Sequence, residues 1–142
     1  NIGAHYLLEG IQEDGTISEM AEELVMNDLR GHFRPEFLNR LDETILFKPL
    51  TKGNIGGIIH LIIADLNERL ADRNLTIELT KEAETFIIDQ AYDPVYGARP
   101  LKRYIQKYVE TLAAKLILAD KVRGGDIIVI GLKDDELVAE VK

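Results

Sequence analysis

Arg99 is the residue whose type and position most plainly suggest chemistry. It stands at the predicted start of a helix, because Pro100 suits the first helical turn. The helix macrodipole disfavours a cation there by about 0.3 to 1 kcal/mol, so a cation at that end usually meets an anion. Free N–H groups at a helix start also suit phosphate, and Lys102 and Arg103 follow directly. Spacing leaves two interpretations open: an anion site at Arg99, or an ordinary ion pair with Asp93 or another carboxylate.

A second pair of arginines flanks a short aromatic segment at residues 33–42. Aromatic side chains anchor this segment, which leaves Arg34 and Arg40 at opposite ends of a rigid turn. Such rigidity suits an arginine held toward a phosphate, because the planar guanidinium can donate to two oxygens at once. Chemistry alone favours the plainer alternative, in which each arginine pairs with a neighbouring carboxylate such as Glu36 or Asp42.

Other catalytic chemistries find little support in the residue types. Cysteine is absent, which excludes disulfides and thiolate zinc sites and fits a reducing compartment. The histidines, His5, His32 and His60, are widely spaced, so we expect no metal site. No GxxxxGK(S/T) phosphate loop occurs, and no apolar strand ends in paired acidic residues that could hold Mg²⁺. These residues are therefore not expected to assemble an ATPase site on their own.

The elements that must position these arginines differ between the two parts of the chain. In the first part, Ser18 predicts the start of a helix with apolar side chains on one face, and Gly31 its end. Pro35 predicts a short helical turn whose aromatic and leucine side chains face a core. The β-branched and aromatic run at residues 44–47 predicts a short buried strand.

A change of pattern at Thr51 marks the predicted domain boundary. Apolar residues then recur at helical spacing in three segments, one following Thr51, one capped by Thr80 and one starting near Pro100. Alternation predicts a strand over residues 75–79, and a hairpin turning at residues 133–135. The second part is therefore expected to be a compact α+β unit of helices and a small sheet. The first part is expected to be the remnant of an α/β unit.

Length and composition bound the class of protein. The 142 residues suffice for one domain, or for one small domain and part of another. Hydrophobic residues at 46% and charged residues at 30% indicate a packed chain, and no apolar run is long enough to span a bilayer. The net charge of -8 disfavours nucleic acid and anionic membranes as partners. The chain opens with Asn1 and no basic leader, so we expect a processed product or a piece of a longer protein.

Charge is distributed unevenly along the chain. Residues 1–50 hold four Lys and Arg against ten Asp and Glu, whereas residues 51–142 hold thirteen against fifteen. Within the second part, residues 99–123 hold seven Lys and Arg against two acidic residues. This local excess favours an anion site beside Arg99, with a solvated basic face as the alternative.

Two strings of residues give the sequence a specific resemblance. FRPEFLNRLDE at residues 33–43 and YDPVYGARPLKRYIQ at residues 92–106 resemble the C-terminal part of the second AAA+ module of ClpB-type protein disaggregases. The resemblance covers essentially the whole chain, and the second string favours the ClpB branch over related unfoldases that feed proteases. It implies that residues 1–50 end the AAA+ large subdomain and that residues 51–142 form the small lid subdomain.

The resemblance also implies roles for the arginines. Arg40 matches the arginine finger, which reaches ATP bound by the neighbouring subunit of a hexameric ring. Arg99, with Gly97 and Ala98 before it, matches the arginine that senses the phosphates of nucleotide bound by its own subunit.

Three further residues match less specific positions of the family. Asn1 matches a polar residue near the γ-phosphate. Ile58 and Ile59 fall on a helix whose apolar side chains pack near the adenine, and ordinary core packing is the alternative for both. The implied cofactors of the intact protein are ATP or ADP with Mg²⁺, with none bound tightly by this chain alone.

The implied function is that of a cytoplasmic ATP-dependent chaperone that threads aggregated polypeptide through the ring. Its implied partners are neighbouring subunits, misfolded polypeptides and a co-chaperone of the DnaK type, whereas this chain alone is expected to be monomeric. Two alternatives stay open at the level of sequence. One is an unfoldase that feeds a protease, and the other is a free-standing interaction domain whose arginines form internal ion pairs.

Overall fold

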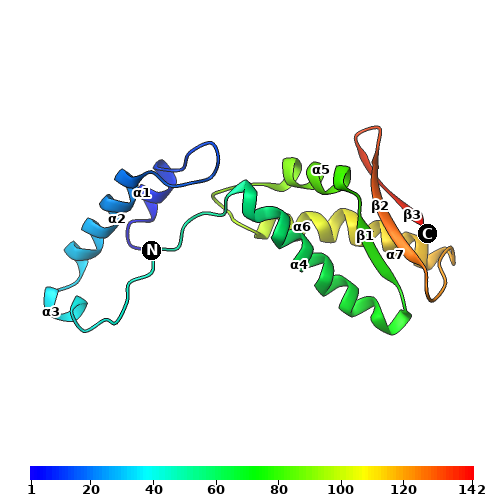
Figure 1. Cartoon of the computed structure of the whole chain (residues 1–142), viewed down its shortest axis with the longest axis horizontal. Helices are drawn as coiled ribbons and strands as arrows, with labels where there is room; N and C mark the ends of the chain where they lie inside the picture. Colours follow the sequence, from blue (N-terminus) through cyan, green and yellow to red (C-terminus); the bar gives the residue numbers. More distant parts are fainter. The chain divides into compact units, whose positions relative to one another are not determined.

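The computed structural model describes residues 1–142 and separates them into two compact units, Asn1–Thr51 and Lys52–Lys142 (Figure 1). The first unit contains α1 (Ala4–Glu9), α2 (Glu19–His32) and α3 (Pro35–Leu38). Ser18 caps α2 as predicted, because its side-chain oxygen accepts a hydrogen bond of 3.2 Å from the Ala21 N–H. The helix runs through Gly31 and ends at His32, one residue beyond the predicted stop.

The first unit packs its helices through a few small residues. Ala21 and Val25 of α2 are its buried hydrophobic side chains. Gly10, directly after α1, lies so close to α2 that a Cβ there would stand 2.3 Å from the Ala21 Cβ. Gly10 is therefore required for the close approach of α1 to α2.

The strand predicted over residues 44–47 is wrong. These residues are neither helix nor strand, and Ile45 and Phe47 are 66% and 85% exposed. A strand needs a neighbouring strand to accept and donate its ladder hydrogen bonds. The first unit offers none, since its β-type pairing is limited to an isolated bridge between Ile11 and Ile17. Three side chains that were expected to face a core are also exposed, because nothing in the first unit covers them: Phe33, Phe37 and Leu41.

The second unit is α+β, as predicted. It begins with α4 (Lys52–Leu70) and the short η1 (Ala71–Arg73), followed by β1 (Thr76–Leu79) and α5 (Lys81–Ala91). Then α6 (Arg99–Ile105), the π-helical turn η2 (Gln106–Glu110) and α7 (Thr111–Leu118) follow one another without a break. The strands β2 (Ile127–Lys133) and β3 (Glu136–Val141) complete the unit.

The sheet has the order β1-β2-β3. The β1 and β2 pair is parallel, with Thr76 opposite Ile127, and the helices from α5 to α7 supply the long crossover that parallel strands need. The β2 and β3 pair is the predicted antiparallel hairpin, with Lys133 opposite Glu136. Asp134 and Asp135 form its two-residue turn with φ angles of 51° and 57°, which matches the positive φ that such hairpin turns require.

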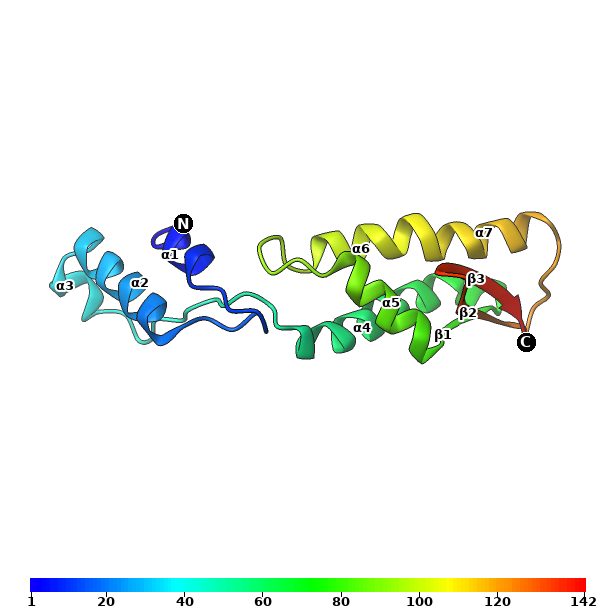
Figure 2. The same cartoon turned by 90° about the horizontal axis from the view of Figure 1, so that it is seen from above.

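The core of the second unit lies between the helices and one face of the sheet. Figure 2 shows α6 and α7 following one another along one side of this unit, and α5 contacts α4, α6 and β2. Asn67 of α4 also ties the helix to the sheet, because its side chain donates to the Ile77 carbonyl at 3.0 Å and accepts from the Ile77 N–H at 2.7 Å. The largest fully buried side chains come from the helices and from the sheet: Ile55, Ile59, Ile77, Ile87, Leu101, Ile105, Val109, Ile128 and Ile130.

Candidate functional site

The loop between α5 and α6 positions Arg99, and Asp93 holds that loop together. The Asp93 Oδ1 atom accepts hydrogen bonds from the Val95 N–H at 2.8 Å and the Tyr96 N–H at 3.3 Å. The Asp93 carbonyl accepts a third from the Gly97 N–H at 3.1 Å. The Asp93 carboxylate therefore serves its own loop, and the ion pair with Arg99 that spacing left open does not form.

Gly97 and Ala98 lead directly into the helix that carries Arg99. Gly97 has a φ of +67°, a conformation that residues with a Cβ rarely adopt, and nothing lies within 4 Å of the place a Cβ would occupy. The glycine is needed for its backbone and not for space. Ala98 is the N-cap of α6, but no side chain caps the helix. Helical hydrogen bonding begins at the Ala98 carbonyl, which accepts from the Lys102 N–H at 3.0 Å.

Arg99 is exposed and forms neither an ion pair nor a side-chain hydrogen bond. The acidic side chains of the same helical segment leave its charge uncompensated. Glu110, one of the two acidic residues in the basic stretch, is held by Arg69 of α4 at 2.8 Å. Arg99 thus places a cation without a carboxylate partner at the start of α6.

A hollow of about 390 Å³ lies along the same helix. Tyr104 and Tyr108 stand in its wall with their ring centroids 4.4 Å apart, and the Lys107 Nζ lies 5.2 Å from the centre of the Tyr108 ring. Burial raises the pKa of Tyr104 above its usual value of 10.0, and Tyr108 raises it further. The phenol is therefore protonated at neutral pH and can donate a hydrogen bond. Helical spacing from Pro100 predicts both tyrosines on the buried face of the helix, whereas Tyr108 is 41% exposed and lines the hollow.

Arg40 follows α3 in the first unit. The Arg40 N–H donates to the Phe37 carbonyl at 3.1 Å, and the rings of Phe33 and Phe37 stack with centroids 5.0 Å apart. Arg40 and Arg34 are both exposed, and neither forms an ion pair. The internal carboxylate pairs that chemistry alone favoured are therefore absent.

The remaining candidate residues have separate surroundings. Asn1 is exposed, and its carbonyl accepts from the Ala4 N–H at 3.3 Å. Ile59 has no exposed surface, so it belongs to the core of the second unit, whereas Ile58 beside it is half-buried and presents some surface. Asn1 and Arg40 thus belong to the first unit, and Ile58, Ile59, Gly97, Ala98 and Arg99 to the second.

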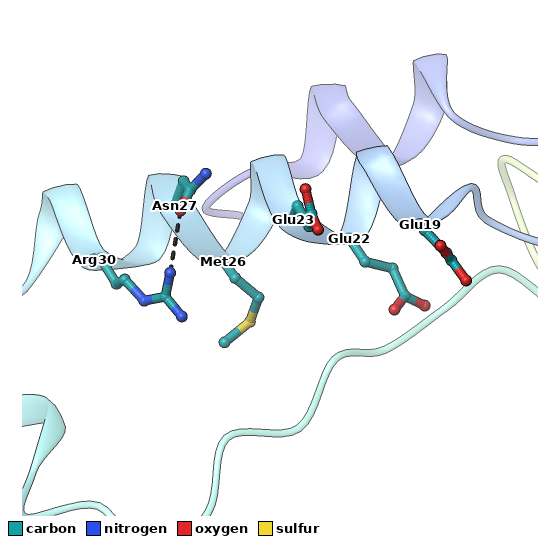
Figure 3. A pocket seen from close by; sticks show the side chains of 6 residues that line it. All are labelled: Glu19, Glu22, Glu23, Met26, Asn27 and Arg30. Carbon is teal, nitrogen blue, oxygen red and sulfur yellow. Dashed lines mark hydrogen bonds between the residues drawn. The ribbon is translucent and has the colours of Figure 1, made fainter.

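A hollow of about 610 Å³ lies along α2 in the first unit, and sequence reasoning missed it (Figure 3). Glu19, Glu22 and Glu23 line it together with Met26. The helical spacing of these residues in the sequence indicates that they share one face of α2. Glu22 is paired with Lys48, and Arg30 also lines the hollow. Carboxylates outnumber this one cation among the lining residues, which makes the hollow unfavourable for a phosphate.

No group of three or more His, Asp or Glu side chains is arranged to hold a metal ion. None of the helices combines the length and the apolar character needed to cross a membrane.

Comparisons with known proteins agree on one family. A family model described as the C-terminal, D2-small domain of ClpB protein matches residues 50–130. Over all 142 residues the chain is 52% identical to the chaperone protein ClpB of Bacillus cereus, and it is 48% identical to that of Aquifex aeolicus over 143 aligned positions. It covers only 16% and 14% of the lengths of these two relatives.

Solved structures give the same result. The chain resembles the complex of Saccharomyces cerevisiae Hsp104 with casein in its extended conformation, with a TM-score of 0.79 and 31% sequence identity. It also resembles the closed state of Hsp104 with ATPγS and casein, with a TM-score of 0.77 and 32% identity. Each comparison covers 99% of this chain and 24% of the other.

Proposed function

The chain belongs to the ClpB family, and on that premise we propose that it contributes nucleotide-responding arginines to an AAA+ ATPase that remodels proteins. In this proposal, residues 1–50 close the large subdomain and residues 51–142 form the lid of the second ATPase module. The match of a D2-small family model to residues 50–130 supports the second assignment. Relatives named ClpB, up to 52% identical over the whole chain, favour this function over that of a protease-feeding unfoldase.

Arg99 is proposed to contact the phosphates of nucleotide bound by its own subunit. The observation that carries this proposal is that Arg99 is exposed and unpaired at the start of α6, where free N–H groups and nearby cations add to its field. A guanidinium in this state is ready to donate two hydrogen bonds to phosphate oxygens. Internal ion pairs, which an interaction domain would use, are missing at this position.

Arg40 is proposed to act in trans, on nucleotide bound by the neighbouring subunit of a hexameric ring. Its position after a turn with stacked aromatic rings, exposed and without a carboxylate partner, supports this role. An arginine finger accelerates phosphoryl transfer by about 10³- to 10⁵-fold by stabilising negative charge in the transition state. Asn1 is proposed to lie near the γ-phosphate, and Ile58 near the adenine.

ATP with Mg²⁺ fits this chain only through the arginines. No phosphate loop or pair of acidic metal ligands is present in the sequence, so the phosphate cradle and the metal would be held by other parts of the intact protein. Bound ATP supplies the phosphoryl group whose hydrolysis drives the conformational cycle. The residues of this chain bind and orient the phosphates and neutralise their charge.

The proposed substrate is misfolded or aggregated polypeptide, as the casein in the Hsp104 complexes suggests. The proposed setting is the cytoplasm, in cooperation with a co-chaperone of the DnaK type. This chain on its own is proposed to be monomeric, because the ring interface would also involve other subdomains and nucleotide.

Two substitutions in the intact protein test the proposal. Arg40→Ala is expected to lower ATP turnover by the second module about 10³-fold or more while leaving the nucleotide affinity of that module within about twofold. Arg99→Ala is expected to lower both, with affinity falling about 10- to 100-fold because charged hydrogen bonds to phosphate are lost. Arg34→Ala and Arg73→Ala are matched controls, since both remove exposed arginines without ion pairs. Normal turnover in Arg40→Ala would remove the trans role, and normal affinity in Arg99→Ala would remove the cis role.

A further inference from the structure

We propose that Asp93 is a positioning residue for Arg99, and that its carboxylate sets where α6 begins and hence where the guanidinium is presented. The inference rests on the proposed contact between Arg99 and nucleotide phosphate. It adds a residue that acts through Arg99 without touching nucleotide itself.

The hydrogen bonds of Asp93 define the loop. Its side chain accepts from two successive backbone N–H groups, those of Val95 and Tyr96, at 2.8 and 3.3 Å. Its own carbonyl accepts from the next N–H along the chain, that of Gly97, at 3.1 Å. One residue therefore satisfies three consecutive donors, and the chain reverses between Asp93 and Gly97, which form an isolated antiparallel bridge.

Packing does not hold this loop in place. Val95 and Tyr96 at its tip are 52% and 68% exposed, so little apolar burial fixes their backbone. Nothing lies within 4 Å of the place where a Cβ of Gly97 would stand, and a glycine would adopt many other conformations if the turn were released. The hydrogen bonds to Asp93 therefore determine the path of the loop.

The loop in turn determines the start of the helix. Only Ala98 separates Gly97 from Arg99, which is the first residue of α6. No side chain caps this helix. Leu101 is fully buried, so the core holds the helix from that residue onward, and the loop determines the residues before it. A change in the φ angle of Gly97 would redirect the Arg99 side chain, or would unwind the helical turn that contains Arg99.

The positioning depends on an oxygen acceptor and not on negative charge. Asp93 does not pair with Arg99, so its charge is not used to hold the guanidinium. Asparagine forms the same turn through its side-chain oxygen, whereas alanine cannot. Asp93→Asn and Asp93→Ala therefore separate geometry from charge.

The test measures the affinity of the intact protein for a non-hydrolysable ATP analogue. Asp93→Ala is expected to weaken binding about 3- to 10-fold, as expected for the loss of hydrogen bonds that fix a binding residue. Asp93→Asn is expected to stay within about twofold of the unmodified protein. Asp89→Ala is the matched control, because Asp89 is an exposed carboxylate on α5 with no ion pair, and its replacement is expected to change nothing.

A double substitution asks whether Asp93 acts through Arg99. If it does, Asp93→Ala combined with Arg99→Ala weakens binding no more than Arg99→Ala alone, because coupled residues give non-additive effects. Losses that multiply would overturn the inference. So would an Asp93→Asn variant as weak as Asp93→Ala, since that result would assign the effect to charge.

Failure of the inference can be told from failure of the proposed function. If Arg99→Ala weakens binding and Asp93→Ala does not, the positioning role is overturned and the proposed function stands. If Arg99→Ala has no effect, the proposed function itself falls. Should Asp93→Ala fail to fold, Asp93→Ser takes its place, since a hydroxyl forms the turn more weakly and predicts intermediate binding. Unchanged binding in Asp93→Ser would then overturn the inference.

Discussion

The two units of this chain present their arginines from very different supports. The first unit buries only Ala21 and Val25 among its hydrophobic residues, whereas the second buries fifteen, drawn from its helices and from its sheet. Arg99 therefore stands on a unit with its own core, and Arg40 on a unit that has little. Packing within this chain therefore specifies the surroundings of Arg99, whereas the first unit has little buried packing to fix those of Arg40.

The difference in buried packing between the two units is tested most strongly by removing core volume from the second unit. Ile59→Ala is expected to lower the free energy of unfolding by about 2 to 5 kcal/mol, because it leaves a cavity among fully buried side chains. Phe47→Ala is the matched control from the first unit, where the ring is 85% exposed, and is expected to change it by about 0.5 kcal/mol or less. Urea unfolding followed by circular dichroism measures both. A larger loss from Phe47→Ala would contradict the contrast between the units.

Each unit contains a helix that is capped by a side-chain hydroxyl, so the same substitution can be compared in both units. Ser18 caps α2 and Thr80 caps α5, each by accepting from the N–H three residues on at 3.2 Å. Replacing either by alanine is expected to cost about 1 kcal/mol locally. Thr80→Ala is expected to lower the unfolding midpoint of the whole second unit, whereas Ser18→Ala increases amide exchange only in α2 and α1. Hydrogen exchange read residue by residue distinguishes these outcomes, and equal spread of the effect in both units would contradict the account.

The smallest expected effect is a pH response in the loop between α1 and α2. Hydrogen bonds from the Thr16 hydroxyl and N–H hold the pKa of Asp14 below its usual value of 3.8. Because the folded pKa is lowered, the stabilisation is complete above about pH 3.8 and is lost as the pH falls through the folded value. The amide of Thr16 is therefore expected to lose protection below that pH, and Asp14→Asn is expected to remove the response. A loop that stays protected in acid would exclude this role for Asp14.

Local signals in the sequence predicted helix caps in both units and the hairpin turn of the second. Thr80 and Ser18 were identifiable as caps, and the pair Asp134-Asp135 occupies the predicted hairpin turn, because caps and short turns depend on residues close in sequence. The π-helical turn at Gln106–Glu110 was not predicted, since periodicity continues through it with only one residue of offset.

Features that depend on distant neighbours could not be predicted from the sequence. The run at residues 44–47 has strand-forming residues but no strand to pair with in its unit. Ile58 and Ile59 are identical in type, and only packing decides that Ile59 is fully buried. At the candidate site, spacing allowed Asp93 to pair with Arg99, whereas the loop amides occupy its carboxylate instead.

The most direct test of the central claim is a structure of the intact protein with an ATP analogue bound in the module that contains this chain. The account predicts that the Arg99 guanidinium donates to a phosphate oxygen of the nucleotide in its own subunit, at about 2.7 to 2.9 Å. It also predicts that the turn at Asp93 is retained. An Arg99 side chain directed to solvent, or paired with a carboxylate while nucleotide is bound, would contradict it.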